Sequence, residues 1–267
     1  MPNSAQRLRP LPLVLLAGLA PLLVACQSSS GARAPAHTGS IGRTGSVTTS
    51  DLAPAQALGA VRTWGAAYTK NEKDKVAALN YAAALRGAGQ TAQAVAVMRK
   101  AAILHPKDRE VLAGFGKALA DNGQFQEALE TIQRAQRRDN PDWRLLSAEG
   151  AILDSLERHQ DARRAYSQAL VLAPEEPQIL NNLGMSYVLT GDLDQAEATL
   201  RRAVARPGST VQTRQNLALV LGLKGRFQEA EKIAAADLAP ADAKANMAWL
   251  RSMTKQENTW AELKKGG

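Results

Sequence analysis

Residues 177–210 read PQILNNLGMSYVLTGDLDQAEATLRRAVARPGST, and the pattern in this stretch decides the fold. Its central alanine, Ala196, has counterparts at steps of 34 residues along the chain: Ala94, Ala128, Ala162 and Ala230. With this alanine at position 20, the chain divides into five units, which span residues 75–108, 109–142, 143–176, 177–210 and 211–244. A strict period of this length predicts a stack of similar structural units.

Three positions of the unit indicate two helices that cross closely. Position 8 is small in every unit, with Ala82, Gly116, Gly150, Gly184 and Ala218. Position 11 is large and apolar and falls on the same helix face, with Leu85, Leu119, Leu153, Tyr187 and Leu221. Position 15 is suited to ending a helix in a left-handed conformation, with Gly89, Gly123, Gly191 and Gly225 in four units. The third unit departs from the pattern there, because it has Glu157.

These units resemble tetratricopeptide repeats, and the resemblance covers residues 75–244. It implies an all-α fold, a right-handed α-solenoid of about five repeats. Because a stack exposes an apolar face at each end, we expect capping helices on both sides. Residues 54–74 are predicted to form the N-terminal one, and residues 245–267 the C-terminal one with a tail, including a short helix around Trp260 and Leu263.

The N-terminus has the features of a lipoprotein signal peptide. Arg7 and Arg9 precede an apolar run over residues 11–24, which is too short to span a bilayer. The run ends in Leu-Val-Ala-Cys at residues 23–26, which resembles a bacterial lipobox. We therefore predict a signal peptide over residues 1–25 and a lipid on Cys26, the sole cysteine.

Residues 26–53 are predicted to be a flexible Ser/Gly-rich tether that follows the lipidated cysteine. They contain almost no large apolar side chain, so ordering them would cost more entropy than burial returns. Removal of residues 1–25 lowers the formal charge from +8 to +6, so the mature chain stays basic. That balance favours anionic partners without choosing among them.

The first helix of each unit is expected to line the concave face of the solenoid, where these proteins bind partners. Amide side chains gather there at positions 5 and 6: Asn80, Asn181, Asn182, Gln215 and Asn216. Amides can both donate and accept, so we predict that they pair with the backbone of an extended peptide; the alternative is that they only meet water. Gly114 and Ala148 interrupt the row. We expect Asn182 and Asn216 to point away from the helix crossing and to contribute nothing to the fold.

Basic pairs form a second feature, on the predicted second helices: Arg99-Lys100, Arg137-Arg138, Arg163-Arg164 and Arg201-Arg202. They are interpreted as a solvated outer face, with contact to anionic lipid headgroups or an acidic partner as the alternative. Nucleic acid is not expected as a partner, because aromatic residues are only 4% of the chain and do not alternate with these pairs.

No motif indicates catalysis, a metal site, a cofactor or a small-molecule substrate. His105 and His159 have no Cys, His or paired carboxylate at ligand spacing, and no phosphate-binding loop or nucleophile elbow occurs. We therefore expect a protein that binds other proteins rather than an enzyme.

A narrower resemblance extends over the mature chain. The lipobox, the tether, Trp64-Gly65-x-x-Tyr68, Ala-Leu-Asn-Tyr-Ala at 78–82 and Gln-Asn-Leu-Ala-Leu-Val-Leu-Gly at 215–222 resemble the TadD family of tight-adherence (Tad/Flp) pilus assembly lipoproteins. This resemblance implies an outer-membrane lipoprotein that faces the periplasm and assists a pilus secretin as a pilotin does. Two alternatives remain: a scaffold of another envelope system, such as outer-membrane protein insertion or polysaccharide export, and a peptidoglycan-associated enzyme or its partner.

Overall fold

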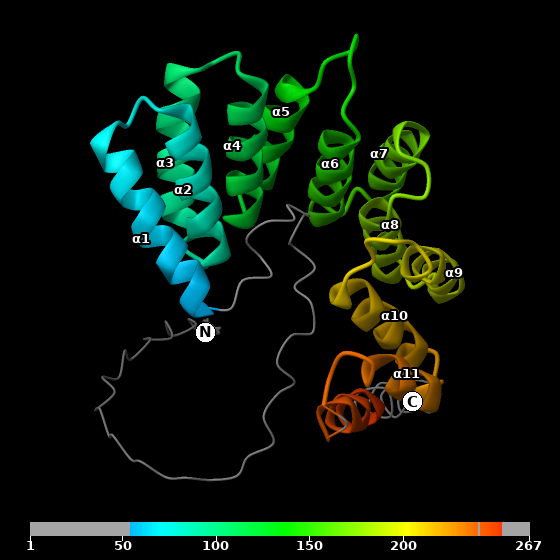
Figure 1. The fold of residues 1–267 in the computed structure, drawn as a ribbon. Coiled ribbons are helices and arrows are strands. Elements are labelled where there is room, and N and C mark those ends of the chain that lie inside the picture. Colours follow the sequence, from blue (N-terminus) through cyan, green and yellow to red (C-terminus); the bar gives the residue numbers. More distant parts are fainter. Residues whose placement is uncertain (1–53, 240, 253–267) are drawn as a thin grey trace, which may run out of the picture. The chain divides into compact units, whose positions relative to one another are not determined.

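The computed structural model describes residues 54–239 and 241–252. Cys26, the predicted signal peptide and tether, and the helix expected around Trp260 and Leu263 lie outside this part of the chain. Within it, regular structure is entirely α-helical (Figure 1). The helices are α1 Pro54–Lys70, α2 Lys75–Gly87, α3 Thr91–Leu104, α4 Arg109–Asp121, α5 Phe125–Ala135, α6 Trp143–Ser155, α7 His159–Leu172, α8 Pro177–Leu189, α9 Leu193–Val204, α10 Val211–Leu223 and α11 Phe227–Ala234. Residues 241–252 are also helical.

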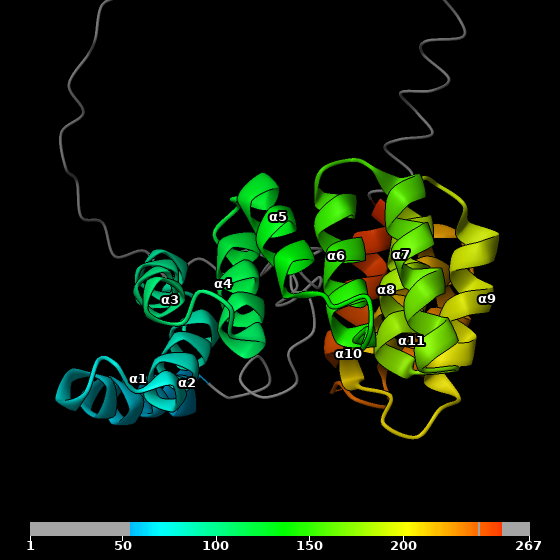
Figure 2. The same cartoon turned by 90° about the horizontal axis from the view of Figure 1, so that it is seen from above.

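Helices α2 to α11 form five pairs that follow one another in chain order, one pair to each 34-residue unit (Figures 1 and 2). Each first helix packs against the first helix of the next unit, from α2 through α4, α6 and α8 to α10. Over the described residues, no two second helices pack as closely as this, and α3 and α5, like α9 and α11, are linked through ion pairs of long side chains. The first helices therefore form one continuous surface, on the inner side of the stack.

The residue before each first helix caps that helix, and from the second unit on this residue is the last one of the preceding unit. Asp74 accepts hydrogen bonds from the backbone N–H groups of Val76 and Ala77, and Asp108 does the same at the start of α4. The same side-chain capping recurs at Asp142, Glu176 and Thr210. Because these side chains satisfy N–H groups that have no partner inside the helix, this position fixes where each unit begins.

The turn inside each unit needs a residue with positive φ. Gly89, Gly123, Gly191 and Gly225 have φ between 75° and 79°. Glu157 adopts the same left-handed conformation in the third unit, with a φ of 60°. All five turns therefore have the same left-handed backbone, although the third unit lacks glycine. Because Glu157 carries a Cβ atom, its backbone is strained in this conformation.

The two helices of a unit cross at position 8, and in the second, third and fourth units the side chain opposite leaves room only for glycine. A Cβ atom on Gly150 would lie 2.5 Å from the ring of Tyr166, and one on Gly184 would lie 2.6 Å from Leu200. The first and fifth units have alanine at position 8, with Ala82 opposite Met98 and Ala218 opposite Ala234. Glycine at position 8 therefore allows the close approach of the helices in the three middle units.

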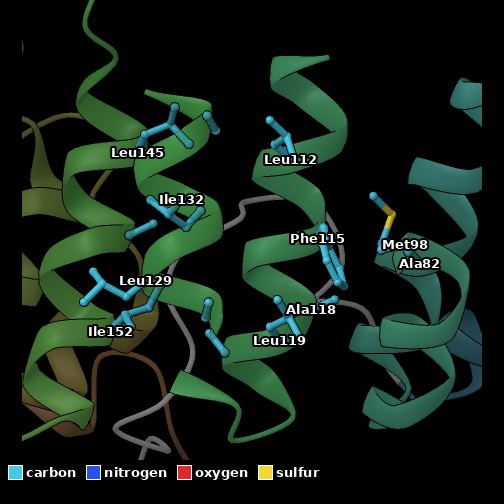
Figure 3. Close-up of a cluster of buried hydrophobic side chains, with 14 of the residues drawn as sticks. Ala82, Met98, Leu112, Phe115, Ala118, Leu119, Leu129, Ile132, Leu145 and Ile152 are labelled. Atoms are coloured by element: carbon cyan, nitrogen blue, oxygen red, sulfur yellow. The ribbon is translucent and has the colours of Figure 1, made fainter. Parts of the chain in front are cut away.

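The core runs as a chain of buried side chains through the stack rather than around one centre. Leu112 and Leu119 of α4, Leu129 and Ile132 of α5, and Ile152 of α6 belong to one buried cluster, which Figure 3 shows. A second cluster begins at Ala196 and reaches Leu250 in the last described helix. This arrangement is expected of repeats that contact only their neighbours.

A buried carboxylate joins the third and fourth units. Asp154 of α6 accepts hydrogen bonds from the hydroxyl groups of Tyr166, at 3.0 Å, and Ser186, at 2.9 Å. Its Oδ1 also lies 2.9 Å from Nδ1 of His159. Burial, followed by the nearby charge of Asp154, raises the pKa of Tyr166 well above its ordinary value. His159 is thus a structural residue of this joint.

Both ends of the stack are packed against a further helix. At the N-terminal end, the rings of Tyr68 in α1 and Tyr81 in α2 have centroids 5.6 Å apart. At the other end, Met247 and Leu250 are buried, and Leu250 fills the space beside Gly222 of α10. No helix in residues 54–239 and 241–252 is long and apolar enough to cross a membrane.

Candidate functional site

We use the name first-helix surface for the side chains at positions 2, 5, 6 and 9 of the five first helices. They are Val76, Leu79, Asn80 and Ala83 of α2, Glu110, Ala113, Gly114 and Lys117 of α4, Arg144, Ser147, Ala148 and Ala151 of α6, Gln178, Asn181, Asn182 and Met185 of α8, and Gln212, Gln215, Asn216 and Leu219 of α10. All of them are exposed or half-buried except Ser147, Ala148 and Asn216.

The structure brings most of the predicted amide residues together, but they bind one another. Asn216 donates from Nδ2 to Oδ1 of Asn181 at 2.8 Å, and Asn182 donates to Oγ of Ser147 at 3.2 Å. In both cases position 6 of one unit donates to position 5 of the unit before it, 35 residues earlier. Asn216 Oδ1 also accepts from Gln212 at 2.9 Å. These amides form an inter-repeat ladder between α6, α8 and α10.

The same contact explains why Gly114 interrupts the amide row. Leu79 occupies position 5 of the first unit, and a Cβ atom on Gly114 would lie 2.9 Å from its Cδ2 atom. The joint between the first two units is therefore apolar, with glycine making room for leucine. The joints around α8 use hydrogen bonds at the equivalent place. Sequence reasoning missed this link, although the paired residues are separated by a constant 35 positions.

The two remaining amides lie outside the ladder. Asn80 donates from Nδ2 to the backbone carbonyl of Val76 in its own helix, at 2.8 Å. Gln215 has a buried Nε2 atom without a hydrogen-bond partner. The residue 35 positions further on is the apolar Leu250, so the ladder cannot continue beyond α10.

The expectation that Asn182 and Asn216 contribute nothing to the fold is wrong. Asn216 is 7% exposed and makes two side-chain hydrogen bonds, and Asn182 is bonded to the neighbouring unit. Small repeat units must bring the first helices close together, which places positions 5 and 6 of adjacent units in contact. Peptide binding by Asn80, Asn181, Asn182, Gln215 and Asn216 stays a prediction.

Three of the four basic pairs lie on second helices and contribute links between neighbouring units. The prediction is wrong for Arg137 and Arg138, which lie beyond the end of α5 at Ala135, where Arg137 binds Asp139 at 2.7 Å. Arg99 binds Glu127 at 3.0 Å, 28 residues further on, and Arg201 binds Glu229 at 2.5 Å, also 28 residues further on. Further links join Lys100 to Glu72 and Arg202 to Glu175. Arg163 instead lies 5.2 Å from the ring centroid of Tyr187. Exposed pairs of this kind contribute little individually to the free energy of unfolding.

The densest charge network surrounds Glu197 of α9. It accepts hydrogen bonds from Lys224 at 2.5 Å, from Arg226 at 2.5 Å and from Arg201 at 2.8 Å. Its side chain is 12% exposed. The hydrogen bond from Lys224 is the largest cause that lowers its pKa from 4.5 to about 2, against the opposing effect of burial. The network joins the fourth and fifth units and acts as a structural element.

Lys117 of α4, on the first-helix surface, differs from most of the cations described above because it takes part in no ion pair among the described residues. Its side chain is half-buried and has no hydrogen-bond or ion-pair partner among the described residues. Burial, followed by the nearby charge of Arg86, lowers the pKa of Lys117 below its ordinary value of 10.5. No group of three or more potential metal ligands occurs within the described ranges.

Protein-family models match most of the five 34-residue units. Models described as tetratricopeptide repeat match residues 85–150, 147–210 and 181–246. A search of curated proteins found no match.

A solved structure shows the same fold, and two others are similar to parts of it. The APC/C hetero-tetramer Cut9-Hcn1 superimposes with a TM-score of 0.60 at 16% identity, over 75% of this chain and 40% of that one. YrrB, described as a protein of this class with an unusual peptide-binding site, gives a TM-score of 0.45 at 20% identity, over 69% of this chain and 99% of its own. MamA from Desulfovibrio magneticus RS-1 gives 0.45 at 18% identity, over 72% and 96%.

Proposed function

Because this chain belongs to the tetratricopeptide repeat family, we propose that it is a protein–protein interaction scaffold anchored in the outer membrane by a lipid on Cys26. Its repeats face the periplasm and assist assembly of a Tad/Flp-type pilus machine, acting on the secretin as a pilotin does. The lipobox at residues 23–26 and the resemblance to Tad lipoproteins support this assignment. The chain acts by binding rather than by catalysis.

The observation that carries the scaffold assignment is the first-helix surface. Five helices present a row of mostly exposed and half-buried side chains, and hydrogen bonds along this row join the third, fourth and fifth units. A surface fixed in this way binds an extended segment with little loss of its own conformational entropy. We place the partner segment along this surface, across α4, α6 and α8.

The anchor is tested by metabolic labelling with a palmitate analogue in cells that express the full chain. The wild type is expected to carry the label and to fractionate with the outer membrane, because several acyl chains together anchor stably. Cys26→Ala is expected to lose both the label and the membrane fraction. Equal labelling of the two would refute the lipid anchor without bearing on the repeats.

The binding surface is tested by a matched pair of substitutions. Ala151 lies half-buried on the first-helix surface, whereas Ala198 is exposed on the second helix α9. Ala151→Arg places a bulky side chain in the path of a bound segment, and Ala198→Arg adds the same charge elsewhere. We expect only the first to abolish copurification of the secretin from crosslinked cells and to reduce surface pili.

Unchanged copurification with Ala151→Arg would move the binding site away from this surface. Capture of components of outer-membrane protein insertion or polysaccharide export, in place of a secretin, would favour a scaffold of those systems. Circular dichroism of both variants verifies that the helices remain intact.

A further inference from the structure

Asp121 and Asp142 are the acidic residues whose charges act on Lys117, and each of them pairs with another cation, as does Glu110 on the first-helix surface. Asp121 binds Arg86 at 2.6 Å, and Asp142 lies 3.4 Å from Arg109. Glu110 binds Lys75 at 2.9 Å. These pairs join α2 to α4 and α4 to the start of α6, so their carboxylates are fixed by the joints between units.

Lys117 has no such partner, and this distinguishes it from the other cations. Every other described Lys or Arg without a hydrogen bond or ion pair is exposed to water: Arg62, Lys70, Lys73, Lys107, Arg134, Arg138, Lys232 and Lys244. Lys117 alone combines half-burial with the absence of a counter-ion. Removing an ammonium group from water without pairing it is unfavourable. An anion bound beside Lys117 would therefore stabilise its charged form.

The neighbouring first helices place no carboxylate at the position equivalent to Lys117. The equivalent positions of the neighbouring first helices hold Ala83 and Ala151, which are small. Arg144 of α6 lies close enough for its charge to act on Lys117, and its side chain is 65% exposed. Its guanidinium is held 4.6 Å from the ring centroid of Trp143, with Asp142 only at 3.9 Å. Two incompletely paired cations thus face the same side of the stack.

We infer that Lys117 and Arg144 form an anion-binding subsite that holds carboxylates of an acidic segment in the partner protein. This inference rests on the proposed function and specifies its partner. An extended segment along α4, α6 and α8 would place acidic side chains against these two cations and its backbone along the small residues between them. Charge complementarity selects an acidic segment over a neutral or basic one.

The probe for this subsite is an acetylated and amidated hexaglutamate peptide, with hexaglutamine as the neutral control. Binding to the purified full chain is measured by fluorescence anisotropy at low and high salt. We expect Lys117→Met to weaken hexaglutamate binding at least tenfold, and Arg144→Gln to weaken it several-fold, because the exposed cation is better screened. Lys117→Arg keeps the charge and should retain most of the affinity.

Lys232→Met is the matched control, because it removes the same charge from an exposed site on α11. It should change the affinity by less than twofold. Equal weakening by Lys117→Met and Lys232→Met, or absence of hexaglutamate binding to the wild type, would overturn the subsite. Asp121 Oδ1 is buried without a hydrogen-bond partner. If Lys117→Met binds hexaglutamate as tightly as the wild type, the charge of Lys117 instead compensates the Asp121 carboxylate within the fold.

The proposed function can survive failure of this inference. If Ala151→Arg abolishes secretin capture while Lys117→Met leaves it intact, the surface binds its partner without the subsite. If Ala151→Arg also leaves capture intact, the surface itself is not the binding site.

Discussion

Asn216 in the fifth unit donates a hydrogen bond to Asn181 in the fourth, over 2.8 Å, and the two residues lie 35 positions apart. The equivalent relationship between Asn182 and Ser147 shows that this is a feature of the repeat and not a local accident. The amides on this surface therefore hold the repeats together before they meet any partner.

The first prediction concerns this ladder. Asn216→Ala should lower the free energy of unfolding by about 1–3 kcal/mol, because the buried Asn216 side chain loses its two hydrogen bonds, to Asn181 and from Gln212. Asn80→Ala removes only a bond within α2 and should cost about 0.5 kcal/mol or less. Urea unfolding of the two variants, followed by circular dichroism, compares them. Equal loss in both would refute the structural role of the ladder.

The helix crossing gives a second prediction. Gly150→Ala should destabilise the chain by about 1–3 kcal/mol, because its Cβ atom would lie 2.5 Å from the buried Tyr166 ring. Gly59→Ala is the control, since nothing lies within 4 Å of the equivalent Cβ atom in α1. It should be neutral or stabilising by up to about 1 kcal/mol, through helix propensity alone. Thermal melting measures both, and a Gly150→Ala variant as stable as wild type would show that the crossing is looser.

A third prediction follows from the unusual turn of the third unit. Glu157→Gly should raise the free energy of unfolding by about 1 kcal/mol, because glycine adopts the observed φ of 60° without strain. The reverse change, Gly123→Ala at a φ of 79°, should lower it by a similar amount. Chemical unfolding tests both directions. Destabilisation by Glu157→Gly would mean that the glutamate side chain, rather than the backbone, matters at this turn.

The fourth prediction concerns acid stability. The pKa of Glu197 is depressed from 4.5 to about 2, so its contribution is complete above pH 4.5 and is lost as the pH falls towards 2. A shift of this size corresponds to at most about 3 kcal/mol, less what solvent screens from the partly exposed arginines. Glu197→Gln should flatten the loss of stability between pH 5 and 3, whereas Glu130→Gln, at an exposed site, should leave the profile unchanged. Urea midpoints across this range decide between the two outcomes.

The sequence by itself determined the architecture. The 34-residue period, the small residues at position 8 and the glycines at the inter-helix turns are enough to predict helix pairs, because crossing distance and left-handed backbone restrict the residue types that fit. Even Glu157 did not alter the turn, since the packing of α6 on α7 imposes a φ that costs a non-glycine residue only about 1–2 kcal/mol.

The tertiary structure alone decided which surface side chains are free. A helical pattern shows that Asn216 and Lys117 share the first-helix surface. It does not show that Asn216 donates a hydrogen bond to Asn181, 35 positions earlier, or that Lys117 has no hydrogen-bond or ion-pair partner among the described residues. Whether a polar group is spent on the fold or left for a partner depends on contacts between units. Those contacts are set by how the helices stack, which no single unit of the sequence specifies.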